Sequence, residues 1–323
     1  MRKLILCGVL LCAVAAAGAD QGQRAEWFRK AGWGVFMHYL AASSDVPVEE
    51  WNKRINAFNV EGLARQLEAA KARYFFITLG QNSGHYLSPN KTYDRLVGIQ
   101  PSKCSTRDLV ADLYQALEPR GIKLLVYLPA GAPDRDKVAM AKLGWQFGPH
   151  PNIEFQRKWE KVIEEWSVRW GSKVKGWWFD GCYWPNIMYR HPKPPNFASF
   201  AAAARKGNPG SIVAFNRGVV YPIHSEAAEE DYTAGEMDDP TKVRNENFWQ
   251  DDAQFQMLSY LGKAWCAEPQ RFTDQQVIDI TTRILKKDGV VTWDVPRQAD
   301  GLIPEAFFQQ LKAIGEAVSK AGR

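Results

Sequence analysis

Short apolar runs alternate with amphipathic stretches along most of the 323-residue chain. The strand-like runs are almost uninterrupted, as in Tyr-Phe-Phe-Ile at 74–77 and Leu-Leu-Val-Tyr at 124–127. Such runs indicate burial on both faces, which parallel strands covered by helices require. The alternation therefore predicts consecutive βα units around a parallel sheet.

The individual elements follow from this alternation. Strands are predicted at 34–40, 73–80, 123–130, 174–181, 211–217 and 290–295. Helices are predicted at 60–71, 106–118, 152–170, 197–206, 253–263, 274–287 and 304–319. At least five βα units in a row point to a barrel or a doubly wound sheet. The size of the chain, and the lack of a glycine-rich dinucleotide motif after any strand, favour an α/β fold of the (β/α)8 TIM-like barrel type.

The first residues predict an export signal. Two basic residues precede an apolar run over 4–17, and small residues at 17–19 fit a cleavage site. We expect residues 1–19 to be removed and residues 20–323 to form one barrel domain, secreted or periplasmic. The apolar run is too short for a permanent membrane span, and no later run approaches the roughly 18 apolar residues that a span needs.

Charge and cysteine content narrow the class of protein. The net charge is +5 and the basic residues form no stripe, so nucleic acid is not an expected partner. Cys104, Cys182 and Cys266 remain after the expected cleavage. Their odd number and wide spacing disfavour a disulfide scaffold and a zinc site, although one bridge between two of them stays open. The 13 tryptophans suit a glycan partner, because a pyranose ring stacks on aromatic faces.

Two carboxylates follow predicted strands at the end where α/β barrels build their active sites. Asp180 follows Gly-Trp-Trp-Phe, so we expect it in an apolar mouth where it acts as nucleophile or base; the alternative is a helix cap or a structural acid. Glu236 comes one strand later, and two such acids are the minimum for hydrolysing a glycosidic bond. Neighbouring acids compete with it for this role: Glu226, Glu229, Glu230, Asp238 and Asp239.

Histidine and arginine side chains occupy further strand ends. His38 ends the first predicted strand and His85 follows the second. Neutral imidazoles both donate to and accept from sugar hydroxyls, although each histidine also has a structural interpretation. Arg217 would hold a sugar oxygen or tune a carboxylate, or else pair with an acid near Glu229. The histidines have no third ligand at a metal-binding spacing, so no metal or cofactor is expected.

Together these segments resemble the α-L-fucosidases of glycoside hydrolase family 29. Trp-Gly-Val-Phe-Met-His-Tyr at 33–39 is similar to the family's G-I-F-x-H-W strand, and the segment at 50–52 to its E-W-Y. Gly-Trp-Trp-Phe-Asp-Gly at 176–181 is similar to the W-F-D-G motif that carries the family's nucleophile. Asn-Arg at 216–217 and Asp-Tyr-Thr-Ala-Gly-Glu at 231–236 resemble the later N-R and D-x-x-T-P-E motifs.

The resemblance implies a retaining exo-glycosidase in which Asp180 is the nucleophile and Glu236 the acid/base. The substrate-binding residues expected with this pair are His38, Glu50, Trp51, His85, Tyr127, Trp178 and Arg217. No cofactor takes part in this chemistry.

Two departures from the family pattern concern the substrate. The family's H-H-D-G-F loop, which contacts fucose, is replaced by Gln-Asn-Ser-Gly-His-Tyr at 81–86. A galactose-like or arabinose-like sugar hydrolysed by the same mechanism is therefore an alternative, and so is a catalytically silent barrel that binds glycans. The chain also ends just after its last predicted helix, so a single catalytic domain without the family's C-terminal β-sandwich is expected.

Overall fold

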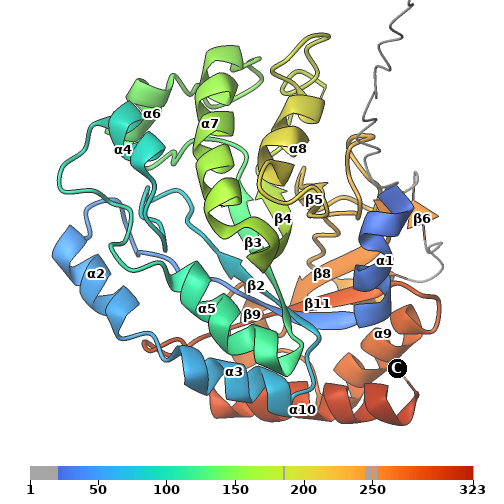
Figure 1. The fold of residues 1–323 in the computed structure, drawn as a ribbon. Helices are drawn as coiled ribbons and strands as arrows, with labels where there is room; N and C mark the ends of the chain where they lie inside the picture. Colours follow the sequence, from blue (N-terminus) through green and yellow to red (C-terminus); the bar gives the residue numbers. More distant parts are fainter. Residues whose placement is uncertain (1–20, 185, 244–248, 251–252, 323) are drawn as a thin grey trace, which may run out of the picture.

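The computed structural model describes residues 21–184, 186–243, 249–250 and 253–322. The predicted export signal at 1–19 lies outside these residues. The described chain forms a curled parallel sheet of seven strands, with helices packed around its outer face (Figure 1). The strand order is β5-β4-β3-β2-β1-β11-β8, and every neighbouring pair is parallel.

The seven strands of the sheet are β1 (Trp33–Met37), β2 (Tyr74–Thr78), β3 (Lys123–Pro129), β4 (Val174–Asp180), β5 (Ile212–Phe215), β8 (Gln256–Tyr260) and β11 (Val290–Val295). Two small antiparallel pairs stand apart: β6 (Trp249–Gln250) with β7 (Ala253–Gln254), and β9 (Gly262–Ala264) with β10 (Ala267–Gln270).

The helices are α1 (Gln21–Ala31), α2 (Val48–Asn56), α3 (Val60–Ala69), α4 (Lys91–Val97), α5 (Leu109–Leu117), α6 (Lys137–Leu143), α7 (Ile153–Trp170), α8 (Phe197–Arg205), α9 (Asp274–Leu285) and α10 (Glu305–Lys320). The six predicted strands and six of the seven predicted helices are confirmed within a few residues at their ends. Helices α1, α2, α4 and α6 were not predicted.

Burial on both faces of the sheet explains the uninterrupted apolar runs. Within a strand, alternate side chains enter two different clusters: Tyr127 and Trp178 pack inside the curl, whereas Val126 and Trp177 pack outward against the helices. Helix α1 adds Phe28 to the inner cluster. Both clusters remove large apolar surfaces from water, so the strands have no polar face.

The predicted helix at 253–263 is wrong, because this segment forms β7, β8 and the start of the β9–β10 hairpin. Its apolar residues recur at a spacing close to the helical period, which suggested an amphipathic helix. In the structure both faces are buried: Leu258 joins the inner cluster, and Met257 joins the outer one. Gln256 is buried inside the curl, where its amide donates to the Ala234 carbonyl and accepts from Thr292 Oγ1. Gln256 therefore interrupts the apolar run of this strand, although it is buried and its side chain is hydrogen-bonded.

The segment 231–237 lies between β5 and β8. Asp231 N donates to Val213 O at 2.9 Å, and Leu258 N donates to Gly235 O at 2.8 Å. Gly235 has φ +68°, and a Cβ there would lie 2.0 Å from the Gln256 carbonyl oxygen, so only glycine fits. Glu236 follows directly and bridges in parallel to Leu258, which places it at the carboxyl edge of the sheet.

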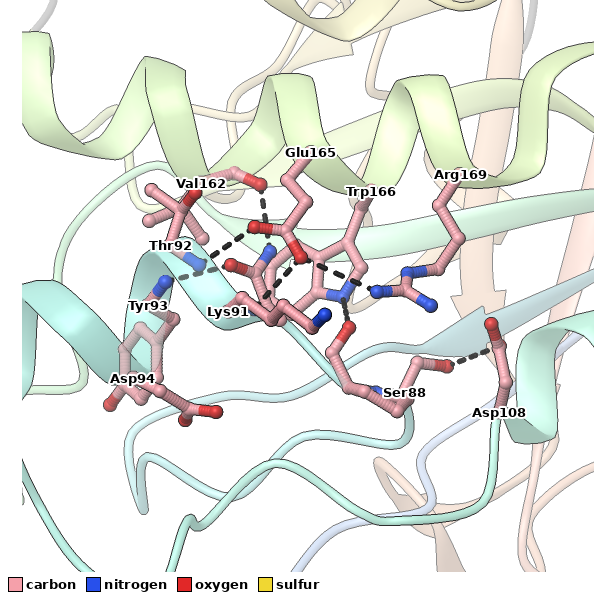
Figure 2. A network of polar contacts seen from close by, with 12 residues as sticks. Ser88, Lys91, Thr92, Tyr93, Asp94, Asp108, Val162, Glu165, Trp166 and Arg169 are labelled. Carbon is pink, nitrogen blue, oxygen red and sulfur yellow. Dashed lines mark hydrogen bonds and ion pairs between the residues drawn. The ribbon is translucent and has the colours of Figure 1, made fainter.

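A network of hydrogen bonds attaches the long region after β2 to helix α7 (Figure 2). Glu165 of α7 accepts hydrogen bonds from the first amides of α4, Lys91 N at 2.8 Å and Thr92 N at 2.7 Å. Trp166 Nε1 donates to Pro89 O at 3.1 Å. Ser88 donates to Asp108, which also caps helix α5 through Ala111 N. These contacts fix the relative positions of helices α4, α5 and α7 around the loop that reaches the carboxyl edge of the sheet.

No helix in the described part of the chain is long and apolar enough to cross a membrane. Cys104, Cys182 and Cys266 are all free thiols, so the disulfide that the sequence left open does not form.

Candidate active site

Side chains at the carboxyl ends of the strands line a cavity of about 250 Å³. The cavity lies where an α/β barrel places its chemistry. Its lining residues come from six parallel segments and the β9–β10 hairpin region: Phe36, His38, Leu40, Gln81, Tyr127, Trp178, Asp180, Glu236, Leu258, Trp265 and Cys266. Aromatic side chains and a few polar groups line the cavity, which is typical of a small-molecule site.

One amide nitrogen joins the two candidate acids. Asn216 Nδ2 donates to Asp180 Oδ1 at 2.8 Å and to Glu236 Oε2 at 2.7 Å. Asn216 follows β5, and its backbone is fixed by bonds from its N–H to Phe179 O and from Cys182 N to its carbonyl. The two acceptor oxygens can therefore be no farther apart than the sum of two hydrogen-bond lengths.

Asp180 is held by donors on both oxygens. Its Oδ1 also accepts from Gly181 N at 2.8 Å, and its Oδ2 accepts from Tyr127 OH at 2.6 Å. Gln81 Nε2 in turn donates to Tyr127 OH at 2.7 Å. Burial, and then the negative charge of Asp180, raise the pKa of Tyr127 well above its usual value, so this phenol remains a neutral donor. Asp180 thus has a fixed orientation.

Glu236 is the carboxyl group with the acidity of a general acid. Burial and then the charge of Asp180 raise the pKa of Glu236 to about 7, against a lowering by the hydrogen bond from Asn216. A group that titrates near neutrality can give up a proton in one step and recover it in the next. Of the five competing acids named from the sequence, none lines this cavity.

Three of these competing acids have structural partners instead. Glu226 pairs with Arg217, Nη1 to Oε1 at 2.9 Å. Glu230 is fully buried and accepts from Phe215 N at 2.7 Å and from Ala227 N at 2.9 Å. Asp239 caps the short turn of residues after it through Thr241 N.

His38 is oriented by a buried carboxylate that the sequence analysis did not single out. His38 Nδ1 lies 2.7 Å from Asp294 Oδ1, and Asp294 Oδ2 accepts from Cys266 N at 2.7 Å. Because the carboxylate can only accept, Nδ1 carries the proton, which leaves Nε2 as an acceptor in the neutral ring. The sequence feature that could have identified Asp294 is its position, because it is an acid near the end of the apolar run at 290–295.

The structure brings five of the predicted site residues into one cavity: His38, Tyr127, Trp178, Asp180 and Glu236. Arg217 lies beside it, where it lines a cavity of about 20 Å³ with Glu236 and pairs with Glu226. Asn216 and Gln81 complete the site. The sequence analysis placed Asn216 in a family-like segment and Gln81 in the loop that departs from the family pattern, and it gave neither residue a role.

Glu50, Trp51 and His85 lie outside this cavity. Trp51 is buried and donates from Nε1 to Tyr86 O at 3.1 Å, and Glu50 lies on the exposed side of α2. His85 is buried against Trp51, with Nε2 3.0 Å from Val46 O. This placement fits the alternative role of His85 as a structural residue. Burial lowers the pKa of His85, and its ring packs on the α2 side of the loop. The loop at 81–86 therefore presents Gln81, and not His85, to the cavity.

A family model matches most of the chain. Residues 54–323 match the family model described as Alpha-L-fucosidase. No curated protein sequence matches the chain.

Solved structures share the fold at low identity. The endo-fucoidan hydrolase MfFcnA4 of glycoside hydrolase family 107 has a TM-score of 0.70 and 16% identity, over 92% of this chain and 54% of that one. This chain thus spans about half the length of that enzyme. A family 29 α-L-fucosidase from Bacteroides thetaiotaomicron has a TM-score of 0.60 and 17% identity, over 93% of this chain and 74% of that one. Isoenzyme 1 from Paenibacillus thiaminolyticus, also an α-L-fucosidase, gives 0.64 and 18%, over 94% and 76%.

Proposed function

Because the chain belongs to the α-L-fucosidase family and is a glycoside hydrolase, we propose that it releases terminal α-L-fucose from glycans by double displacement. Asp180 is the nucleophile and Glu236 the acid/base. The reaction is that of an exo-glycosidase, with the terminal sugar in the 250 Å³ cavity. The proposal includes neither a metal nor a cofactor.

The shared amide of Asn216 is the observation that carries this proposal. Its nitrogen bonds the two carboxylates at 2.8 and 2.7 Å, so their facing oxygens are close together. Retaining glycosidases hold their carboxyl groups roughly 5–5.5 Å apart, whereas inverting ones leave roughly 6.5–9.5 Å for a water molecule. The two hydrogen bonds limit the separation of these oxygens to about 5.5 Å, a value in the range of retaining enzymes, which supports retention.

In the first step, an Asp180 oxygen forms a bond to the anomeric carbon as the glycosidic C–O bond breaks. Glu236 transfers its proton to the departing oxygen, which leaves as a neutral hydroxyl. In the second step, water attacks the same carbon, Glu236 takes the water's proton, and Asp180 departs as a carboxylate. The pKa of about 7 for Glu236 suits both transfers.

The remaining cavity residues position the sugar. His38, fixed by Asp294, offers its Nε2 to a ring hydroxyl, and Gln81 offers the free part of its amide. Trp178 provides an aromatic wall, and its own Nε1 is already satisfied by Ala234 O at 2.9 Å. Trp265 lies across the cavity, 5.9 Å from the His38 ring between centroids.

One observation favours a second candidate, the same mechanism on a galactose-like or arabinose-like sugar. Gln81 faces the cavity and His85 turns away to Val46 O, so the loop offers an amide where the sequence analysis expected an imidazole. An amide has different donors and acceptors, and it would select a different hydroxyl pattern.

The proposal extends to the fold and the location of the protein. The segment 231–237 makes backbone hydrogen bonds to both β5 and β8. These bonds support its role as the remaining strand position of an eight-membered (β/α)8 barrel. The basic and apolar start of the sequence supports cleavage after residue 19 and export to the periplasm or medium.

A panel of aryl α-L-fucosides, β-D-galactosides and α-L-arabinosides tests the proposal, with residues 20–323 and the Asp180→Asn variant as the two proteins. We expect release from the fucoside that Asp180→Asn abolishes. Selective release from another glycoside would support the second candidate. Release from none by the folded protein would contradict both, and would leave the glycan-binding barrel as the interpretation.

A further inference from the structure

One buried carboxylate joins two separate parts of the cavity wall. Asp294 lies near the end of β11, is fully buried, and accepts a hydrogen bond on each oxygen of its side chain. Its Oδ1 lies 2.7 Å from His38 Nδ1, and its Oδ2 accepts from Cys266 N at 2.7 Å. His38 follows β1, whereas Cys266 lies in the turn of the β9–β10 hairpin. Both residues line the cavity of about 250 Å³, so a single side chain reaches two of its walls.

The turn of the β9–β10 hairpin depends on this carboxylate. At the base of the hairpin, Leu261 N donates to the backbone oxygen of Asp294 at 3.0 Å. In the turn, Cys266 has φ +47°, a conformation that a residue with a Cβ keeps only when its surroundings support it. The Asp294 side chain provides such support at the Cys266 amide. It therefore also holds the neighbouring ring of Trp265, whose centroid lies 5.9 Å from that of His38.

The backbone donor at Cys266 fixes which nitrogen of His38 carries the proton. A backbone N–H can only donate and a carboxylate can only accept, so His38 Nδ1 is a donor and Nε2 of the neutral ring an acceptor. A carboxamide at position 294 would have to keep its oxygen at Cys266 N. Its NH2 group would then face His38 Nδ1, which would have to accept, and the ring proton would move to Nε2.

We propose that Asp294 is a positioning residue that sets the hydrogen-bond polarity of His38 and the place of Trp265 together. A sugar hydroxyl donates to His38 Nε2, and the Trp265 ring stands beside the imidazole. Because one side chain holds both, a change at Asp294 alters a polar contact and an aromatic contact at once. The sugar contact rests on the proposed function, whereas the tautomer of His38 and the position of the turn do not.

The tautomer of His38 is the most direct test. Long-range ¹H–¹⁵N correlation spectra at about pH 9, where an imidazole is ordinarily neutral, show which ring nitrogen is protonated, and His38→Gln assigns the signals. We expect the proton on Nδ1 in the unmodified protein and on Nε2 in Asp294→Asn. Asp108→Asn, the same isosteric change in the carboxylate that caps α5, should leave the tautomer unchanged. The same tautomer with Asp294 and with Asp294→Asn, or a ring protonated on both nitrogens, would overturn the proposal.

Hydrogen exchange of the Cys266 amide tests the second contact. Asp294→Asn keeps an acceptor for this N–H, so its exchange rate should stay within about twofold of the unmodified protein. Asp294→Ala has no acceptor there and should exchange about tenfold faster. Leu261 N–H, which donates to the backbone at 294, should stay protected in all three proteins. Equal exchange at Cys266 in all three would overturn the role of Asp294 in the turn. Should Asp294→Ala fail to fold, the tautomer in Asp294→Asn decides the proposal.

Fluorinated substrates test the contact with the sugar. A fluorine atom cannot donate a hydrogen bond, so aryl α-L-fucosides with fluorine in place of the hydroxyl at C2, C3 or C4 probe the acceptor at His38 Nε2. We expect the preference in kcat/KM for the parent fucoside over one of these analogues to fall about tenfold in Asp294→Asn. The electronic effect of fluorine is the same for both proteins and cancels in this comparison.

The outcomes separate this proposal from the proposed function. An unchanged preference together with an inverted tautomer would overturn the sugar contact of His38. Turnover of no fucoside by the unmodified protein would contradict the proposed function instead, and the tautomer and exchange measurements, which need no substrate, would still decide the positioning role of Asp294.

Discussion

The side-chain amide of Asn216 sets the spacing of the acid pair. Its two hydrogen bonds hold Asp180 and Glu236 together, and the bond to Glu236 opposes the rise in the pKa of that carboxyl group. Two charged acids at this distance would repel one another. The charge of Asp180 is therefore the reason, after burial, that Glu236 keeps its proton up to about pH 7.

This acidity predicts the alkaline side of the pH profile. Since Glu236 must be protonated to assist the leaving group, kcat/KM should fall as the pH rises through about 7. Glu236→Gln should abolish this alkaline limb and lower kcat/KM on a natural oligosaccharide by roughly 10²–10⁴, with a much smaller loss on an aryl fucoside. A pH–rate series on both substrates measures this. An unchanged alkaline limb in Glu236→Gln would assign the acid to another residue.

At the level of single residues, the sequence identified what stands directly after a strand. Asp180, Glu236 and His38 were predicted from that position, and the structure places them in one cavity. Asp294 and Gln81 were not assigned roles, because their importance depends on which neighbours they meet. Asp294 is one acid in a strand until the fold brings His38 to 2.7 Å. His85 shows the reverse case, since the loop conformation turns it toward Val46 O.

At the scale of elements, the capping of α4 by a residue of α7 makes one helix depend on another. Glu165→Ala should lower the free energy of unfolding by about 1–2 kcal/mol, because two amides of α4 lose their acceptor and the helix loses a favourable charge at its start. The hydrogen bonds from Thr92 and Lys91 lower the pKa of Glu165 despite its burial. Urea unfolding measures the loss. The neighbouring Glu164→Ala, on the same helix, should change stability much less; equal losses would contradict the capping role.

The loop before the 231–237 segment contains a fully buried glutamate, Glu230. Burial raises the pKa of Glu230 to about 8, whereas an unfolded glutamate titrates near about 4.3. As the pH rises from about 4.3 to 8, the unfolded chain releases this proton and the folded protein keeps it, so the contribution of Glu230 to stability falls.

Glu230→Gln should remove this pH dependence. Relative to the variant, the unmodified protein should lose stability between pH 5 and 8, by at most about 1.4 kcal/mol per pH unit. Urea unfolding at four pH values measures the difference. The variant also loses hydrogen-bond acceptors, which shifts its stability at every pH and leaves the slope as the informative quantity. Parallel curves for the two proteins would show that Glu230 is ionised in the folded state.

Helices and strands could be predicted where the spacing of the apolar residues fitted only one of the two. The runs at 74–77 and 124–128 are apolar without interruption, and the strands that contain them were found. The segment over β8 was mistaken for a helix because Gln256 and Ser259 interrupt its apolar run, and their buried partners come from other parts of the chain. Short helices such as α4 depend on caps supplied from α7, a contact between residues more than 70 positions apart that no local pattern contains.

At the scale of the whole molecule, the parallel sheet delivers residues from seven separate segments to one edge. As in α/β barrels, the strands determine where the site residues lie, and residues at the strand ends and in the loops carry out the chemistry. The family match over 54–323 assigns the chain to the glycoside hydrolases, and the arrangement of Asp180, Asn216 and Glu236 supports a retaining mechanism. The export signal and the exact sugar are proposals at this same scale, and the panel of aryl glycosides tests the sugar.

The covalent role of Asp180 is the central claim, and trapping it is the most direct test. The protein is incubated with 2-deoxy-2-fluoro-α-L-fucosyl fluoride, whose fluorine slows the release of the glycosyl enzyme. Mass spectrometry of the intact protein and of its peptides then locates any adduct. The account predicts one fluorofucosyl group, attached to Asp180 and absent in Asp180→Asn. An adduct on another residue, or inactivation-free turnover with inverted product, would contradict it.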